Sequence, residues 1–177
     1  GPDHGRRGYG FDADTRIGGL RQPNPWTRSW IAFFRDHRLL YMAHETFDAG
    51  QLSLPLLQRI STLAERLPDM IDEPLHPSLI HGDLWTGNII VDRGQVTGFV
   101  DPAICYADAE IELAFTTLFG TFGEPFFKSY NEIRPISDGF FEGRLDIYNL
   151  WYLLVHVRLF GGSYVSSVER VLSRLGV

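Results

Sequence analysis

The chain has 177 residues and a net charge of −6, and 44% of its residues are hydrophobic and 21% charged. This composition is typical of a folded globular protein and excludes a disordered one. The excess of acidic residues argues against nucleic acid as a partner. The longest apolar run, Leu150 to Val155, is too short to span a membrane. Cys105 is the single cysteine, so we expect no internal disulfide and a reducing, cytoplasmic location.

The first predicted helix follows a glycine-rich N-terminal segment. Residues 1–8 resemble a remnant of tag removal or a linker, and we expect residues 9–177 to form the folded part. Asn24-Pro25 is typical of a helix start, and apolar residues at helical spacing predict a helix from there to about Gly50. The same spacing predicts a second helix from Leu56 that Pro68 ends.

A short β region follows these helices. Leu79-Ile80 precede a polar loop, and residues 89–91 and 96–100 predict a hairpin around the turn at residues 92–94. The remaining predicted helices cover residues 111–118 with Asp108 as cap, residues 126–130, residues 145–160 up to Gly161-Gly162, and residues 165–175. The predicted fold class is therefore mostly α with one small β-hairpin (α+β).

The polar loop is the most informative segment. Residues 81–88 are HGDLWTGN, and VDPA follows at residues 100–103. Asp83 lies at the mouth of the loop, and the hairpin can bring Asp101 back beside Asn88. Oxygen ligands of this kind suit Mg²⁺ together with phosphate oxygens, and a free carboxylate beside them can accept a proton from an attacking hydroxyl. The arrangement favours phosphoryl transfer.

These motifs resemble those of kinase-like phosphotransferases that act on small molecules, in which His-Gly-Asp replaces the His-Arg-Asp of protein kinases. Further segments make residues 9–177 similar to the fructosamine kinase (ketosamine kinase) family: Ile17-Gly18-Gly19, Gln22, Asn24, Trp30, Phe33-Phe34, Arg38-Leu39, Trp85, Leu118-Phe119-Gly120, Leu159-Phe160-Gly161-Gly162 and Tyr164. The resemblance implies a protein-kinase-like fold and transfer of the γ-phosphoryl group of ATP to a sugar hydroxyl. The acceptor would be a ketosamine, either a small molecule or attached to a protein, and glycation adducts would thereby be removed.

The resemblance also implies roles for individual residues. Asp83 would be the catalytic base, and Asn88 and Asp101 would hold Mg²⁺ bound to the phosphates of ATP. His81 would support the loop backbone without transferring protons itself. Glu112, at a position where the family usually has Asp, would brace the loop from the following helix.

One expected part of such a kinase has no counterpart in the sequence. The family's smaller lobe precedes these motifs and carries a glycine-rich loop, a lysine on a strand and a glutamate on a helix. The chain has a single lysine, Lys128, in a helical stretch, and nothing before Asp12 suits that lobe. We therefore expect the C-terminal lobe of a kinase-like fold without its N-terminal lobe, which alone would bind ATP weakly.

Several alternatives stay open from the residues. Trp85 either packs the loop or stacks on the acceptor sugar. Asp108, Glu110 and Glu112 are interpreted first as residues that complement the helix dipole, although they would also suit an acceptor amine. Histidines in helical patterns are interpreted as core or boundary residues: His37, His44 and His156.

Three rival functions also remain. The first is a related kinase with an aminoglycoside, choline or a sugar as acceptor. The second is a lobe that binds a metabolite or partner without catalysis. The third, a metal hydrolase, is disfavoured because no second histidine lies at a ligand-like spacing from His81.

Overall fold

The computed structural model describes residues 8–177, so the expectation for the first seven residues lies outside the described part. Its helices are α1 (Trp30–Phe34), α2 (Leu40–Asp48), α3 (Leu54–Arg66), α4 (Ala109–Leu118), α5 (Glu124–Ile133), α6 (Leu145–Phe160) and α7 (Val165–Arg174). Its strands are β1 (Thr15–Ile17), β2 (Leu20–Gln22), β3 (Ser78–Ile80), β4 (Ile89–Asp92), β5 (Gln95–Phe99) and β6 (Cys105–Ala107). The chain is thus mostly helical with small sheets, as predicted.

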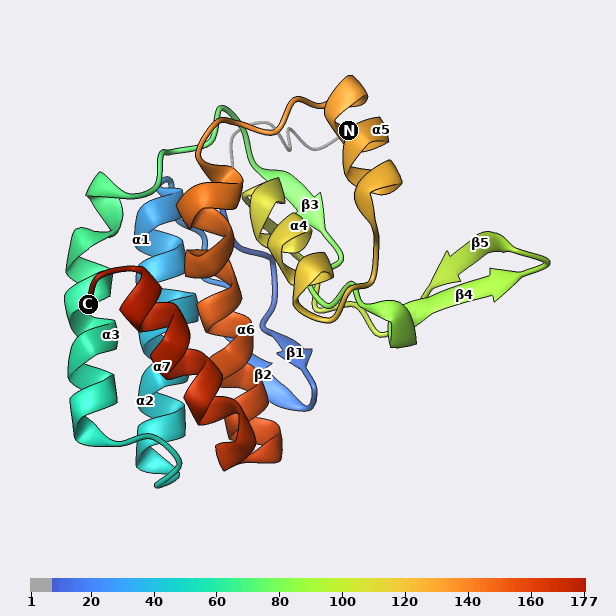
Figure 1. The fold of residues 1–177 in the computed structure, drawn as a ribbon. Helices are drawn as coiled ribbons and strands as arrows, with labels where there is room; N and C mark the ends of the chain where they lie inside the picture. The colour runs from blue at the N-terminus through green and yellow to red at the C-terminus, as the bar shows by residue number, and fades with distance from the viewer. Residues whose placement is uncertain (1–7) are drawn as a thin grey trace.

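The core is organised around α6, which is apolar on nearly every side. Ten of its residues are buried, including Leu150, Leu154 and Val157, and a helix that is hydrophobic all round must be enclosed by others. Helices α2, α4 and α7 pack against it, and α3 packs on α2 and α7 (Figure 1). Because α4 and α6 are in direct contact, a loop that lies on α4 can also reach residues of α6.

The first helix does not begin where Asn24-Pro25 predicted. Helix α1 begins at Trp30, and Ser29 caps it by accepting a hydrogen bond from the backbone N–H of Ala32 (3.0 Å). Asn24 is instead buried, and its amide oxygen accepts a hydrogen bond from the guanidinium of Arg38 (2.6 Å). The prediction was wrong because a buried guanidinium needs acceptors, and this tertiary demand outweighs a local capping signal. A π-helical turn over Arg35–Leu39 joins α1 to α2.

The predicted hairpin is present, but it is not the whole of the β structure. Strands β4 and β5 pair antiparallel with an irregularity between Ile90 and Val91, and Figure 1 shows this hairpin projecting from the helical body. The described residues also hold two further antiparallel pairs, β1 with β2 and β3 with β6. These strands of three residues are too short to give a period-two pattern, so the sequence did not predict their pairing.

Several local predictions are confirmed. Asp108 caps α4 by accepting a hydrogen bond from the backbone N–H of Glu110 (3.0 Å), and α6 ends at Gly161, whose φ is +89°.

Within residues 8–177, no helix is long and apolar enough to cross a membrane.

Candidate active site

Helix α4 holds the backbone of the polar loop. Strand β3 pairs with β6, and β6 leads into α4, so the loop that follows β3 lies against the first turns of this helix. The carboxylate of Glu112 accepts hydrogen bonds from the backbone N–H groups of Gly82 (2.7 Å) and His81 (3.2 Å). Burial raises the pKa of Glu112, and these two hydrogen bonds oppose that shift. This is the contact that the family resemblance implied for Glu112.

Gly82 is held from two further sides. Its carbonyl oxygen accepts a hydrogen bond from the hydroxyl of Tyr152, a buried residue of α6 (2.9 Å). Its φ is +82°, and a Cβ at this position would lie 2.2 Å from the carbonyl oxygen of Ala103. Both observations require glycine, because the left-handed region and the close approach each exclude a side chain. The turn before Asp83 is therefore fixed by α4, α6 and the segment after β5.

Asn88 orients the carboxylate of Asp83. The amide nitrogen of Asn88 donates to the backbone oxygen of Asp83 (2.8 Å) and to its Oδ2 (3.0 Å). Both partners are acceptors, so the amide nitrogen must face Asp83 and the amide oxygen must point elsewhere. Burial raises the pKa of Asp83, and the hydrogen bond from Asn88 partly counteracts this effect. The result is a half-buried carboxylate that has no cationic hydrogen-bond partner within residues 8–177.

The hairpin returns to this loop, as the sequence predicted. The backbone N–H of Asp83 donates to Nδ1 of His81 (3.3 Å), so Nε2 of His81 carries the proton and donates to the carbonyl oxygen of Val100 (2.8 Å). The N–H of Val100 in turn donates to the backbone oxygen of Asn88 (3.0 Å). Asp101 follows with φ +51°, is exposed, and contributes to the raised pKa of Asp83.

Asp83 faces a cavity of about 550 Å³. Ile17 and Gly18 close one side of it, at the turn between β1 and β2. Aromatic rings from four places in the chain make much of the rest: Trp85, Phe115, Phe119, Phe160 and Tyr164. This cavity therefore combines one carboxylate with an apolar, aromatic wall, a common composition for a small-molecule site.

Trp85 contributes to the wall of this cavity and packs on its own loop. Its side chain is 42% exposed, and a Cβ on Gly87 would lie 2.4 Å from the indole ring. The indole thus lies across Gly87, which leaves room for the ring because it has no side chain. Packing on the loop is one of the two roles expected for Trp85, and stacking on an acceptor sugar stays a prediction.

His156 lines the same cavity, although the sequence indicated a core or boundary position for it. It is half-buried, in agreement with a boundary position, but the functional assignment missed it. Gly18, Phe119, Phe160 and Tyr164 belong to segments that carried the family resemblance without an assigned role. These four residues line one cavity, although their segments are far apart in the sequence. Their joint presence among the segments that carried the resemblance was the signal in the sequence that could have indicated a shared site.

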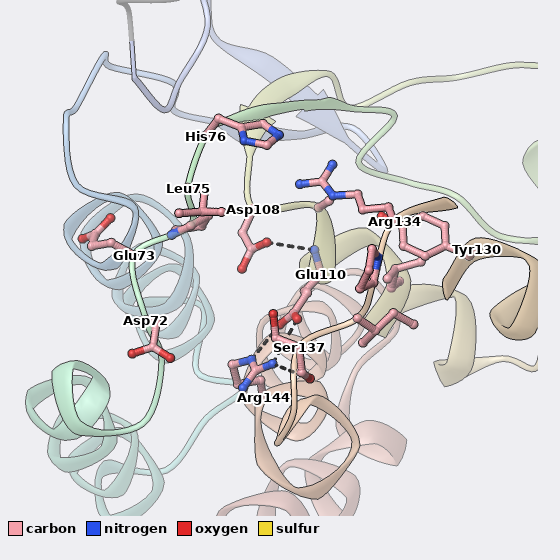
Figure 2. Close-up of a pocket in the computed structure, with 15 residues that line it drawn as sticks. Asp72, Glu73, Leu75, His76, Asp108, Glu110, Tyr130, Arg134, Ser137 and Arg144 are labelled. Carbon is pink, nitrogen blue, oxygen red and sulfur yellow. Dashed lines mark hydrogen bonds and ion pairs between the residues drawn. The ribbon is translucent and has the colours of Figure 1, made fainter. Parts of the chain in front are cut away.

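Asp108 and Glu110 line a different cavity of about 440 Å³ (Figure 2). The structure does not bring them together with Asp83. Asp108 accepts a hydrogen bond from the hydroxyl of Tyr148 (2.8 Å), and Glu110 pairs with the guanidinium of Arg144 (2.6 Å). The capping role predicted for Asp108 is confirmed. Both carboxylates are engaged with the protein itself, which is the arrangement of a structural polar cluster.

Comparison with known proteins agrees with this geometry. Residues 3–176 match the family model described as "Fructosamine kinase". A Synechocystis protein named "Probable ketoamine kinase" is 37% identical over 169 residues, which cover 94% of this chain and 55% of that protein. The chain spans about half the length of the curated relatives it matches.

Solved structures extend the comparison. The crystal structure of a "putative fructosamine-3-kinase" from Thermobifida fusca is 29% identical and superposes with a TM-score of 0.90 over 98% of this chain and 60% of that chain. An aminoglycoside phosphotransferase, a thermostable mutant, is 17% identical and shares the fold with a TM-score of 0.52 over 93% of this chain and 56% of that chain. The match over nearly the whole chain, together with the loop at residues 81–88, shows that the chain belongs to the fructosamine kinase family.

Proposed function

We propose that the chain carries the catalytic and acceptor-binding part of an ATP-dependent ketosamine kinase. The observation that carries the proposal is the carboxylate of Asp83, which faces an aromatic cavity and has no cationic partner among the described residues, while Glu112 and Tyr152 hold the loop behind it. Membership of the fructosamine kinase family supports a ketosamine as acceptor, either a small molecule or a sugar bound to a protein. Removal of glycation adducts is the physiological purpose that this activity would serve.

Asp83 would act as the general base. The acceptor hydroxyl gives its proton to the carboxylate while its oxygen attacks the γ-phosphorus of ATP, and the bond from that phosphorus to the bridging oxygen of ADP breaks. Asn88 fixes one oxygen of the carboxylate and leaves the other for the acceptor hydroxyl. His81 has no part in the proton transfer, because both of its ring nitrogens are engaged by the backbone.

Asn88 and Asp101 fit a magnesium ion bound to nucleotide phosphates. The amide nitrogen of Asn88 faces Asp83, so its oxygen is available to a hard cation. The exposed carboxylate of Asp101 makes no hydrogen bond or ion pair with another described residue. No cluster of three or more His, Cys, Asp or Glu suited to a metal occurs within residues 8–177, in keeping with the few protein ligands that Mg²⁺ usually takes beside phosphates and water. The ion would neutralise charge on the transferring phosphoryl group.

The test is ADP release that depends on the acceptor. The chain, and in parallel the longest natural reading frame that contains it, would be incubated with Mg-ATP and one acceptor at a time. The panel would contain a fructosamine, free fructose, choline and an aminoglycoside. We expect release with the fructosamine and at least tenfold less with the others. Release of ADP with one of the other acceptors and not with the fructosamine would contradict the proposal. So would the absence of ADP release with every acceptor in both proteins.

A further inference from the structure

The ionisable groups that line the Asp83 cavity include no lysine or arginine among the described residues. The ionisable side chains among these lining residues are Asp83, His156 and Tyr164. Aromatic faces present partial negative charge to whatever lies above them. The cavity therefore offers a carboxylate and several aromatic rings, and its described lining residues offer no lysine or arginine to an anionic ligand.

His156 adds an acceptor to this set. Its Nδ1 lies 2.7 Å from the backbone oxygen of Tyr152, which can only accept, so Nδ1 carries the ring proton. Nε2 is then a lone-pair acceptor as long as the ring is neutral. Burial lowers the pKa of His156, and the nearby charge of Asp83 opposes this shift. A neutral ring at pH 7 follows, and its acceptor nitrogen Nε2 has no hydrogen-bond partner within residues 8–177.

Aromatic rings surround this histidine. Its ring centroid lies 4.9 Å from that of Phe119, 5.1 Å from that of Tyr164 and 5.6 Å from that of Phe160. Trp85 lines the same cavity. Because these rings and His156 line one cavity, an ammonium group inside it can contact aromatic rings and a hydrogen-bond acceptor together, as in the aromatic cages in which proteins bind such groups.

We propose that the cavity recognises its acceptor through a protonated amine, which binds against the faces of Phe119, Phe160 and Tyr164 and donates a hydrogen bond to Nε2 of His156. The inference rests on the proposed function, in which Asp83 faces a hydroxyl of the sugar attached to that amine. Selection for an amine-linked sugar is then a property of the cavity wall, while Asp83 supplies the chemistry. An ether-linked sugar of the same shape lacks both the charge and the donor.

The test compares two matched ligands by isothermal titration at pH 7. One is 1-butylamino-1-deoxyfructose and the other is its oxygen counterpart, 1-O-butylfructose. We expect the amine to bind the chain about tenfold more tightly, the range typical of a partly desolvated cation–aromatic contact with one added hydrogen bond. Phosphorylation of both ligands would be measured in parallel, on the chain and on the longest natural reading frame.

Variants locate the preference. Phe160→Leu and His156→Leu should each reduce the amine-to-ether ratio to threefold or less. Phe141→Leu is the matched control for the first, because both phenylalanines are exposed, Phe160 to 66% and Phe141 to 57%, and Phe141 lies outside this cavity. The control should keep the wild-type ratio.

The outcomes distinguish failure of the amine inference from failure of the proposed kinase function. Equal binding of both ligands with phosphorylation of both would overturn the amine inference and leave the kinase function intact. A preference that neither cavity variant reduces would also overturn it, because the amine would then bind elsewhere. If neither ligand binds or is phosphorylated, the proposed function falls together with the inference.

Discussion

Two cavities among the described residues differ in how the protein surrounds their carboxylates. In the cavity of Figure 2, Glu110 pairs with Arg144, and Asp108 accepts hydrogen bonds from Tyr148 and from the first turn of α4. In the other cavity, the carboxylate of Asp83 receives one hydrogen bond from the part of the chain that the structure describes, donated by the amide of Asn88. The two cavities share no lining residue: Asp108 and Glu110, at the start of α4, line the first, and Phe115 and Phe119, near its end, line the second.

The difference separates structural from functional acidic residues. A buried carboxylate that the protein satisfies contributes to the fold, and its loss costs stability. A half-buried carboxylate that the protein leaves open toward a cavity is available for proton transfer. The comparison predicts opposite consequences for mutation in the two cavities.

Asp83→Asn should have the largest effect, and it should be on the rate alone. Loss of the general base should lower the phosphorylation rate by about 10³-fold. Folding should be unaffected, because the amide can still accept the hydrogen bond from Asn88 and one half-buried charge is removed. Single-turnover rates and a thermal melt measure both. The matched variant is Asp138→Asn at an exposed position, and a comparable loss of rate there would contradict the assignment.

Glu110→Ala should show the reverse behaviour. The side chains of Glu110 and Arg144 are 13% and 11% exposed, so removal of one partner leaves a poorly solvated guanidinium. The free energy of unfolding should fall by about 3 kcal/mol, measured by denaturant titration, while the rate of the folded fraction changes little. Glu142→Ala, at an exposed position nearby, should change stability very little. A tenfold loss of rate without a loss of stability would contradict the structural role of Glu110 and indicate a role in the reaction.

Glu112→Ala should combine both effects at a smaller size. It removes the acceptor of two backbone N–H groups and should cost about 2 kcal/mol of unfolding free energy. The rate should also fall, because the turn before Asp83 loses its support on α4. Glu112→Asp keeps the charge with a shorter reach and should lose less of both. Unchanged rate and stability in Glu112→Ala would contradict the bracing role of this residue.

Acid should switch the reaction off through Asp83. The base must be ionised, and burial raises its pKa above the ordinary value of 3.8, so the rate should fall at a higher pH than for an exposed aspartate. Asn88 donates to this carboxylate and thereby lowers its pKa. The Asn88→Ala variant should move the acid limb of kcat/KM to higher pH. A limb that stays in place, or moves to lower pH, would exclude Asp83 as the group observed.

His76→Ala should have the smallest effect. His76 is exposed at the rim of the Figure 2 cavity and faces no described hydrogen-bond partner. Unfolding free energy should change by less than about 0.5 kcal/mol, and the rate should stay at the wild-type value. A tenfold change in either the rate or acceptor binding would show that this second cavity takes part in the reaction.

Local features were well predicted from the residues. The apolar spacing of α3 and α7, the cap at Asp108 and the end of α6 at Gly161 all appear where the sequence indicated them. Each depends on residues a few positions apart. The predicted start of α1 was wrong because Asn24 accepts a hydrogen bond from Arg38, which is fourteen positions away. The pairing of β3 with β6 was not predicted because the whole hairpin separates the two strands in the sequence.

The sequence by itself determined the contiguous loop at residues 81–88, its family and the return of Asp101 through the hairpin, because these depend on short spacings along one strand and its turn. Tertiary structure decided which acidic residues are paired and which are open. Glu110 meets Arg144 across thirty-four positions of the chain, whereas Asp83 meets His156, Phe119 and Phe160 in one cavity. Pairing and burial result from packing between distant segments of the chain. They set the charge, the pKa and the accessibility of each carboxylate, and the chemistry depends on these properties.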